Sequence, residues 1–185
     1  LALLDCVLAG QHVEGLRLEW VFMQNRPALR LVVRHIFMRQ EAGDDAEARR
    51  WMERMVDQLN PNDNHGLRDM LMLEYLRCGD AARAAALGDR FAEDFGTMRY
   101  NRALAHYLAG HEAQANAVLS DALHEFPLIG KALLAKSAPM PKRDLITVGS
   151  KEEANLYRAE HLSVWPPVAL AWLASMRKRS LAAQS

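Results

Sequence analysis

The sequence has little of what marks several large classes of protein. Its 185 residues include two cysteines, Cys6 and Cys78, which are too few for a disulfide framework. Both lie in apolar stretches, so we expect buried thiols and a reducing compartment such as the cytoplasm. No apolar run approaches the roughly 18 residues that a membrane-spanning helix needs. Because Asp5 interrupts the apolar start, we expect no secretory signal there.

An excess of charge of one sign is also missing. The 23 basic residues balance 23 acidic residues, so the whole molecule has no net field to attract nucleic acid or an anionic membrane. Half of the residues are apolar and a quarter are charged, as in ordinary globular proteins. We therefore expect a folded protein whose partner is neither nucleic acid nor a membrane.

Signatures of catalysis and of metal binding are absent too. The chain has no GxSxG elbow, no phosphate-binding glycine loop and no CxxC pair. His106 and His111 are five residues apart, a spacing that does not place two ligands on one face of a helix. His161 lies on the apolar side of a late helix and is predicted to be structural. We expect no enzyme activity, no cofactor and no metal.

What the sequence does contain is a repeated motif. The stretch AGDDAEA starts at Ala42, and CGDAARA, AGHEAQA and a degraded AGQHVEG follow the same pattern. Their glycines are Gly10, Gly43, Gly79 and Gly110, at steps of 33, 36 and 31 residues. Apolar residues on both sides recur at steps of three and four, as on one face of a helix. Each glycine is therefore predicted to end a helix, because glycine adopts the left-handed cap conformation without steric cost.

These apolar stripes predict the core. The stripe after Gly43 is Ala48, Trp51, Met52, Met55, Val56 and Leu59. The stripes around Gly79 are Leu67, Met70, Leu71, Tyr75 and Cys78 before it and Ala81, Ala84, Ala85, Gly88, Phe91, Ala92 and Phe95 after it. The stripe after Gly110 is Ala115, Val118, Leu119 and Ala122. The methionines Met52, Met55, Met70 and Met72 are expected to fill this core, and an adaptable binding surface is the alternative.

A one-sided stripe cannot be buried alone, so the repeated units must stack. Nothing alternates with period two, and Pro27, Pro61 and Pro127 fall between units. We predict an all-α protein, a right-handed array of antiparallel helical hairpins forming one domain over 1–185. The hairpins are expected at about 1–25, 28–60, 64–95 and 98–126.

The last third breaks the pattern. We expect a short helix and an extended basic loop over 131–149. The loop is expected to be simply solvated, and the alternative is that it binds an acidic peptide or phosphate. Ser150 and Glu153 form a capping box before a helix whose stripe is Ala154, Tyr157 and His161. A second helix has the predicted stripe Val168, Ala171, Trp172, Ser175 and Met176. Together the loop and capping helices, at about 128–178, are expected to cover the end of the array.

These features resemble the tetratricopeptide repeat family. In the unit around Gly110, Ala115, Ala122 and Pro127 match the family's small, small and proline positions. The unit around Gly43 has one extra residue between Ala48 and Pro61. The usual tryptophan and glycine positions of the first helix are mostly not matched. The stretches NRP, NPNDNHG, GSKEEANLY and VWPPVALAWL are similar to uncharacterised bacterial tetratricopeptide-like proteins. Their C-terminal half is similar to suppressor-of-tumorigenicity-type proteins. The resemblance implies a helical scaffold and gives no activity.

Stacked hairpins of this kind curve around a concave groove that binds a peptide or helix of a partner protein. We expect a non-catalytic interaction scaffold whose groove contacts are Arg30, Arg34, Phe37, Asp69, Leu73 and Arg102. Two alternatives remain open: a self-associating module that forms a homo-oligomer, and an accessory or regulatory arm of a larger enzyme. The second alternative follows from the first residue, which is not methionine, so we expect a longer protein or a removed segment before it.

Overall fold

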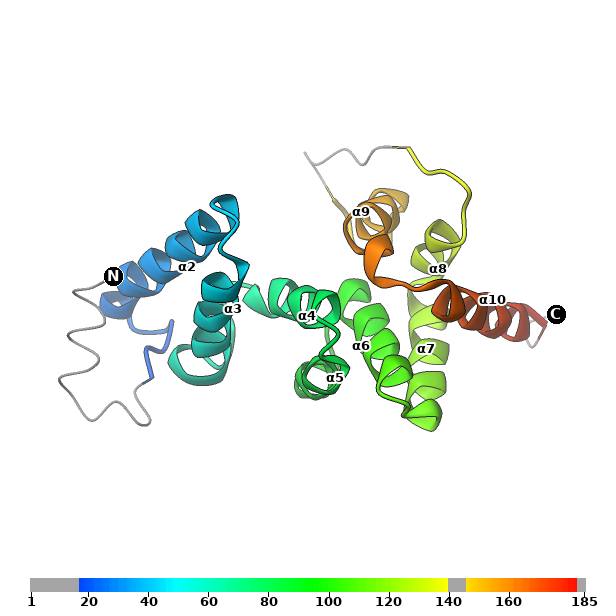
Figure 1. Cartoon of the computed structure of the whole chain (residues 1–185), viewed down its shortest axis with the longest axis horizontal. Helices are drawn as coiled ribbons and strands as arrows, with labels where there is room; N and C mark the ends of the chain where they lie inside the picture. Colours follow the sequence, from blue (N-terminus) through cyan, green and yellow to red (C-terminus); the bar gives the residue numbers. More distant parts are fainter. Residues whose placement is uncertain (1–16, 140–145, 183–185) are drawn as a thin grey trace. The chain divides into compact units, whose positions relative to one another are not determined.

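The computed structural model describes residues 17–139 and 146–182. All regular structure within these ranges is helical, with nine α-helices and no strand (Figure 1). The all-α part of the sequence prediction is therefore confirmed. None of the helices in these ranges is both long and apolar enough to cross a bilayer.

The helices are numbered in chain order. Their bounds are α2 (Arg26–Glu41), α3 (Asp45–Arg54), α4 (Leu67–Arg77), α5 (Ala81–Arg90), α6 (Gly96–Leu108), α7 (Glu112–Glu125), α8 (Pro127–Leu133), α9 (Lys151–His161) and α10 (Pro167–Ala182). Shorter segments are the 3-10 helices η1 (Met23–Asn25) and η3 (Leu162–Val164) and the π-helical turn η2 (Met55–Leu59). The contacts divide the chain into an N-terminal unit, Leu1–Leu71, and a C-terminal unit, Met72–Ser185.

The repeated glycines have the backbone conformation that the sequence predicts. Gly43, Gly79 and Gly110 have φ angles of 73°, 75° and 79°, while Gly10 lies outside the described residues. In each turn the residue after the glycine donates its N–H to the carbonyl five residues earlier, at 2.8, 2.8 and 2.9 Å. This is the hydrogen bond of a Schellman motif, and it ends α2, α4 and α6 in the same way.

The residue after the glycine also starts the next helix. The Asp44 carboxylate accepts the N–H of Glu47 at 3.4 Å, and the Asp80 carboxylate accepts the N–H of Arg83 at 3.2 Å. Both bonds satisfy donors that a helix start leaves without a partner. His111 occupies the same position before α7, and its side chain makes no capping bond.

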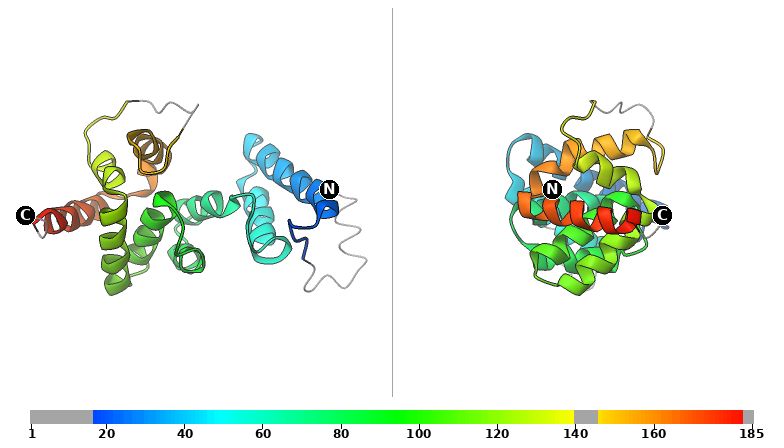
Figure 2. Two further views of the ribbon diagram at one scale, coloured as in Figure 1. Left: turned by 180° about the vertical axis from the view of Figure 1, so that it is seen from behind. Right: turned by 90° about the vertical axis from the view of Figure 1, so that its right-hand side faces the viewer.

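In the N-terminal unit, α2 and α3 lie side by side and bury the predicted stripe (Figures 1 and 2). All six stripe residues after Gly43 are buried, as are Leu29, Val32 and Ile36 of α2, the helix that packs against α3. Glu47 fixes Trp51, the largest of them, by accepting its indole N–H at 2.8 Å. Hydrogen bonds from the Arg50 guanidinium, countered in part by burial, lower the pKa of Glu47 to about 2.

A π-helical turn extends α3. Residues Met55–Leu59 follow α3 without a break, and the N–H of Asn60 bonds to the carbonyl of Met55 at 2.8 Å. This turn coincides with the one extra residue between Ala48 and Pro61, because a π turn contains one residue more than an α turn. The wider turn still buries Met55, Val56 and Leu59.

A buried carboxylate fixes the start of α4. Asp63 has a φ of 46° and is almost fully buried. It accepts the backbone N–H groups of Leu67 and Arg68 at 2.9 and 2.8 Å, and the Arg68 guanidinium lies 3.0 Å away. Asp63 therefore satisfies two backbone donors at the start of α4.

In the C-terminal unit, α6 packs between α5 and α7. Gly88 allows the close approach of α5, because a Cβ there would lie 2.8 Å from Arg102 and 3.0 Å from Met72. The stripe after Gly110 is fully buried, as predicted. The stripe after Gly79 is buried at Ala84, Ala85 and Gly88 but ends early, since Phe95 is exposed.

The last helices close this unit. α9 packs on α8, and α10 packs on α7 and α8. Ser150 accepts the N–H of Glu153 at 3.1 Å, while the Glu153 carboxylate accepts the N–H of Gly149. The predicted capping box is therefore present, with its second bond one residue earlier than expected.

The stripe predicted for α10 is wrong by about one residue. The helix buries Ala169, Leu173 and Met176, whereas Val168 is 61% exposed. Ala171 and Ser175 are exposed as well. Of the predicted stripe, Met176 is buried and Trp172 is partly buried, stacked on Tyr107 at a centroid distance of 4.4 Å. The sequence VALAWLA is apolar on every face of a helix, so its periodicity does not select the buried face.

A buried polar cluster joins α6 to α9. The Tyr157 hydroxyl donates to the Asn101 side-chain oxygen at 2.8 Å and accepts from the Trp165 indole at 3.0 Å. His161 stacks on the Tyr157 ring with a centroid distance of 4.5 Å. Tyr100 lies beside them, donating to the Phe126 carbonyl at 3.0 Å. Each bond compensates for the removal of a polar group from water.

The buried histidine makes stability depend on pH. Burial lowers the pKa of His161 to about 4, and the charge of Arg77 acts in the same direction. The unfolded chain takes up this proton near pH 6.5, so it binds more protons than the folded chain between about pH 6.5 and 4. The free energy of unfolding is expected to fall by roughly 2–3 kcal/mol as pH drops through this window.

Urea unfolding followed by circular dichroism at several pH values measures this loss. In His161→Phe, which keeps an aromatic ring next to Tyr157, the loss should shrink by about the same amount. His124→Ala, a change at an exposed position of α7, is the matched control and should keep the wild-type dependence. Equal pH dependence in the wild type and His161→Phe would contradict the assignment.

Asp63→Ala should destabilise the N-terminal unit by roughly 1–2 kcal/mol, because two backbone donors of α4 lose their acceptor. Asp63→Asn should cost less, since asparagine retains an acceptor oxygen and tolerates positive φ. Asp45→Ala, at the exposed start of α3, is the control and should stay within about 0.5 kcal/mol. Urea midpoints that rank Asp45→Ala below Asp63→Ala would refute the capping role.

Candidate functional site

One side of α2 exposes apolar and charged side chains together. A surface hollow on this side is lined by Arg30, Val33, Arg34, Phe37, Met38 and Glu41, which we call the α2 face. Phe37 and Met38 are 45% and 55% exposed, so neither side chain belongs to the core. The spacing of three and four residues explains why all six share one side of a helix.

The α2 face contains three of the six residues that the sequence predicts as partner contacts. Arg30, Arg34 and Phe37 lie four and three residues apart, and Arg34 forms no ion pair with any described residue. The Arg30 guanidinium lies 5.4 Å from the centre of the Trp20 ring, within cation–π range. With Glu41 at one end, the face has an excess of positive charge.

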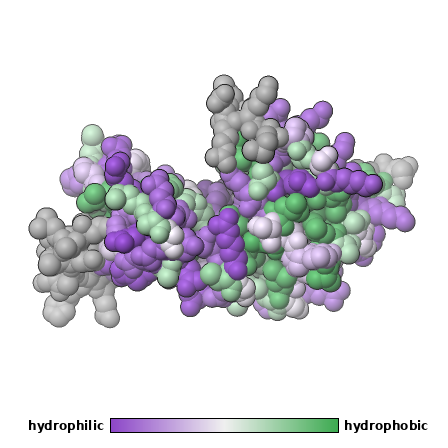
Figure 3. All heavy atoms as spheres, turned by 45° about the horizontal axis from the view of Figure 1, so that its top comes forward, coloured by the Kyte–Doolittle hydropathy of each residue, from purple (hydrophilic) through white to green (hydrophobic). Residues whose placement is uncertain are grey.

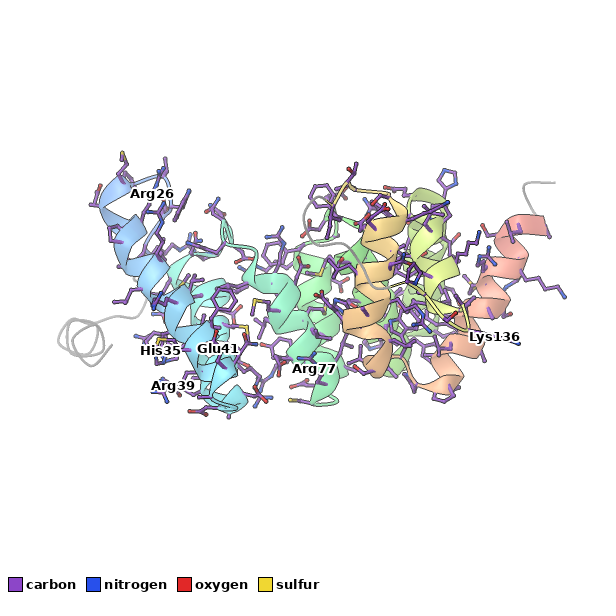
Figure 4. All side chains as sticks on the ribbon, turned by 90° about the horizontal axis from the view of Figure 1, so that it is seen from above. Arg26, His35, Arg39, Glu41, Arg77 and Lys136 are labelled. Atoms are coloured by element: carbon purple, nitrogen blue, oxygen red, sulfur yellow. The ribbon has the colours of Figure 1, made fainter. Side chains whose placement is uncertain are left out.

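The ends of α2 are fixed by neighbouring side chains. Figure 4 shows Arg26 at one end of the helix and His35, Arg39 and Glu41 towards the other. The Arg26 guanidinium donates to the Trp20 carbonyl at 3.0 Å, and Arg39 lies 3.5 Å from the Asp44 carboxylate. Partial burial and the charge of Arg39 lower the pKa of His35. Leu29, Val32 and Ile36 are buried on the other side of α2, which packs against α3. The exposed side is therefore presented on a packed helix.

The other three predicted contacts have different surroundings. Asp69 and Leu73 lie on α4 and are partly buried. Arg102 lies on α6, and its Nε donates to the Asp89 carboxylate at 2.7 Å. Arg102 is therefore engaged within the C-terminal unit. Whether any of the six binds a partner stays a prediction.

The sequence expectations for cysteine and for methionine have different outcomes. Cys78 is exposed, so the expectation of a buried thiol is wrong there. It follows the last residue of α4 in the turn, outside the helical stripe. Met52, Met55 and Met72 are buried, which confirms core filling for these three. Cys6 lies outside the described residues.

The C-terminal unit contains a pocket of about 240 Å³ between α8 and α9. Its walls are mainly apolar, from Leu128, Ala132, Ala135 and Ala154, and Lys131 and Lys151 also line it. The basic loop predicted over 131–149 starts here, but 140–145 are not among the described residues. Figure 3 shows hydrophobic residues gathered on the visible face of this unit.

Two histidines that the sequence separates are in contact. His106 ends the core-facing part of α6 and His111 precedes α7, and their Nδ1 atoms lie 3.3 Å apart. The other ring nitrogen of His106 lies 3.0 Å from the Asp89 carboxylate. A group of three or more metal-binding side chains does not occur in the described part of the chain.

Comparison with known proteins adds no assignment to this geometry. No family model, no curated protein and no solved structure matches the chain.

Proposed function

We propose that this chain is a non-catalytic scaffold for protein interaction, built as a tetratricopeptide-like array of helical hairpins. The single observation that carries the proposal is the α2 face, where two exposed apolar side chains lie among two arginines on a fixed helix. Arginine and aromatic residues contribute most to protein interfaces. The repeated glycine turns support the array, because each ends its helix with the same hydrogen bond.

The chemistry of the α2 face selects the kind of partner. Phe37 and Met38 offer apolar surface that a partner's apolar side chains would bury. Arg30 and Arg34 favour carboxylates, which guanidinium groups bind in bidentate geometry. An amphipathic peptide or helix with acidic side chains beside its apolar stripe fits both requirements.

Selection from a displayed library of helical peptides tests the proposal. Peptides that bind the full chain should combine acidic and apolar positions. Phe37→Ala should weaken the selected peptides at least tenfold, about 1.4 kcal/mol, because it removes the central apolar contact. Arg34→Glu should weaken acidic peptides by a similar factor through like-charge repulsion.

The matched controls lie on α10, where Val168 and Lys178 are exposed. Val168→Ala and Lys178→Glu make the same types of change away from the α2 face and should leave affinity unchanged. The proposal is abandoned if no peptide is selected, or if the α2 variants bind as well as these controls.

A second copy of the chain is the other possible occupant of exposed apolar surface, which also includes Val21, Phe22 and Met23 before α2. The peptide-binding proposal expects a monomer at tens of micromolar in sedimentation equilibrium. A dimer that Phe37→Glu converts to monomer would instead assign the α2 face to self-association. A dimer unaffected by Phe37→Glu would place that contact elsewhere and leave the peptide experiment decisive.

A further inference from the structure

The glycine turn brings two particular positions together. These are the residue four before the glycine and the residue one after it. In the first turn they are Arg39 and Asp44, whose charged atoms lie 3.5 Å apart. In the third they are His106 and His111, with Nδ1 atoms 3.3 Å apart. The five-residue spacing excludes two ligands on one helix, but this pair spans two helices and the turn supplies the proximity.

His111 differs from its counterparts in the other repeats. Asp44 and Asp80 use the same position to cap the following helix, whereas His111 makes no capping bond. Its ring is tilted by 50° to that of His106, with a centroid distance of 5.5 Å. The third repeat thus lacks a side-chain cap and has an imidazole pair instead.

The hydrogen bonds define which ring nitrogen of each neutral histidine carries hydrogen. The Asp89 carboxylate accepts hydrogen bonds only, so Nε2 of His106 carries the hydrogen that it shares with Asp89. The lone pair of His106 is then on Nδ1 and faces His111. For the contact at 3.3 Å to be a hydrogen bond, Nδ1 of His111 must carry the donated hydrogen.

A metal ion fits in place of that hydrogen. Two nitrogens bound to one tetrahedral zinc ion at about 2.0–2.1 Å lie about 3.3–3.4 Å apart, and the two Nδ1 atoms are 3.3 Å apart. His111 can move its hydrogen from Nδ1 to Nε2, since its side is exposed to water. The exchange leaves both rings neutral, so it requires no net loss of a proton.

Asp89 supplies the usual support of a histidine ligand. Metal-bound imidazoles donate their other N–H to a carboxylate or carbonyl, which fixes the ring and raises its basicity. Asp89 does this for His106 at 3.0 Å, and Arg102 holds the same carboxylate oxygen at 2.7 Å. His106 is itself almost fully buried, so its ring is already positioned.

We propose that His106 and His111 form a binding site for a divalent transition-metal ion of the zinc type, with Asp89 as the residue that positions His106. Imidazole nitrogens suit zinc, copper and nickel and do not suit magnesium or calcium. The ion has two protein ligands, and water completes its coordination. This site lies in the C-terminal unit and does not depend on the function proposed for the α2 face.

Calorimetric titration of the full chain with Zn²⁺ tests the site. One ion is expected to bind per chain, and Mg²⁺ should not compete. His111→Ala should weaken binding at least tenfold, and Asp89→Asn should weaken it by about 10–100-fold, as for other residues that orient a ligand. His124→Ala, an exposed histidine on α7, is the control and should bind as the wild type does.

Nitrogen NMR of the histidine side chains gives a readout that a structural role would not change. Without metal, His106 should carry hydrogen on Nε2 and His111 on Nδ1. With Zn²⁺, His111 should switch to Nε2 while His106 stays unchanged. Circular dichroism of each variant shows whether it is folded. Either no binding of Zn²⁺ up to millimolar concentration, or equal binding by His111→Ala, would overturn the proposal.

Discussion

One backbone hydrogen bond, closed across a left-handed glycine, ends α2, α4 and α6 in the same way. The bond leaves the next residue at the start of the following helix, so the same four or five residues both stop one helix and begin another. Side chains near the turn are consequently brought close whatever their chemistry. An arginine and an aspartate meet in the first turn, and two histidines meet in the third. The backbone of the turn is common to all three, and the side chains four residues before and one residue after the glycine differ.

Most of the helical fold could be predicted because its causes are local. Glycine conformation, aspartate caps and one-sided apolar stripes depend on a few neighbouring residues, and the stripe after Gly43 is buried throughout. The register of α10 could not be predicted, because an evenly apolar sequence leaves the choice of buried face to distant helices. Cys78 was predicted to be buried because the helical stripe was extended to it, but α4 ends one residue earlier, at Arg77.

The candidate sites were predictable to different degrees. The clustering of Arg30, Arg34 and Phe37 follows from helical spacing alone, although binding by them is a separate question. The pairing of His106 with His111 was missed because the spacing was considered on a single helix. The repeat contained a signal for this pairing. Arg39 and Asp44 occupy the same positions around Gly43 as His106 and His111 do around Gly110, and their opposite charges suggest proximity. Asp89 could not be added from sequence, because it comes from another helix and depends on how α5 packs against α6.

The polar contacts of the C-terminal helices have a consequence for the order of folding. Tyr157 bonds to Asn101, and Trp172 bonds to Asn116 at 2.9 Å, and each pair is 56 residues apart in the chain. The glycine turns, by contrast, join residues five apart. Local contacts close quickly and distant ones slowly. The repeats can therefore form while the chain is still being synthesised. Asn101 and Asn116 then bond to water until α9 and α10 have formed and packed against them.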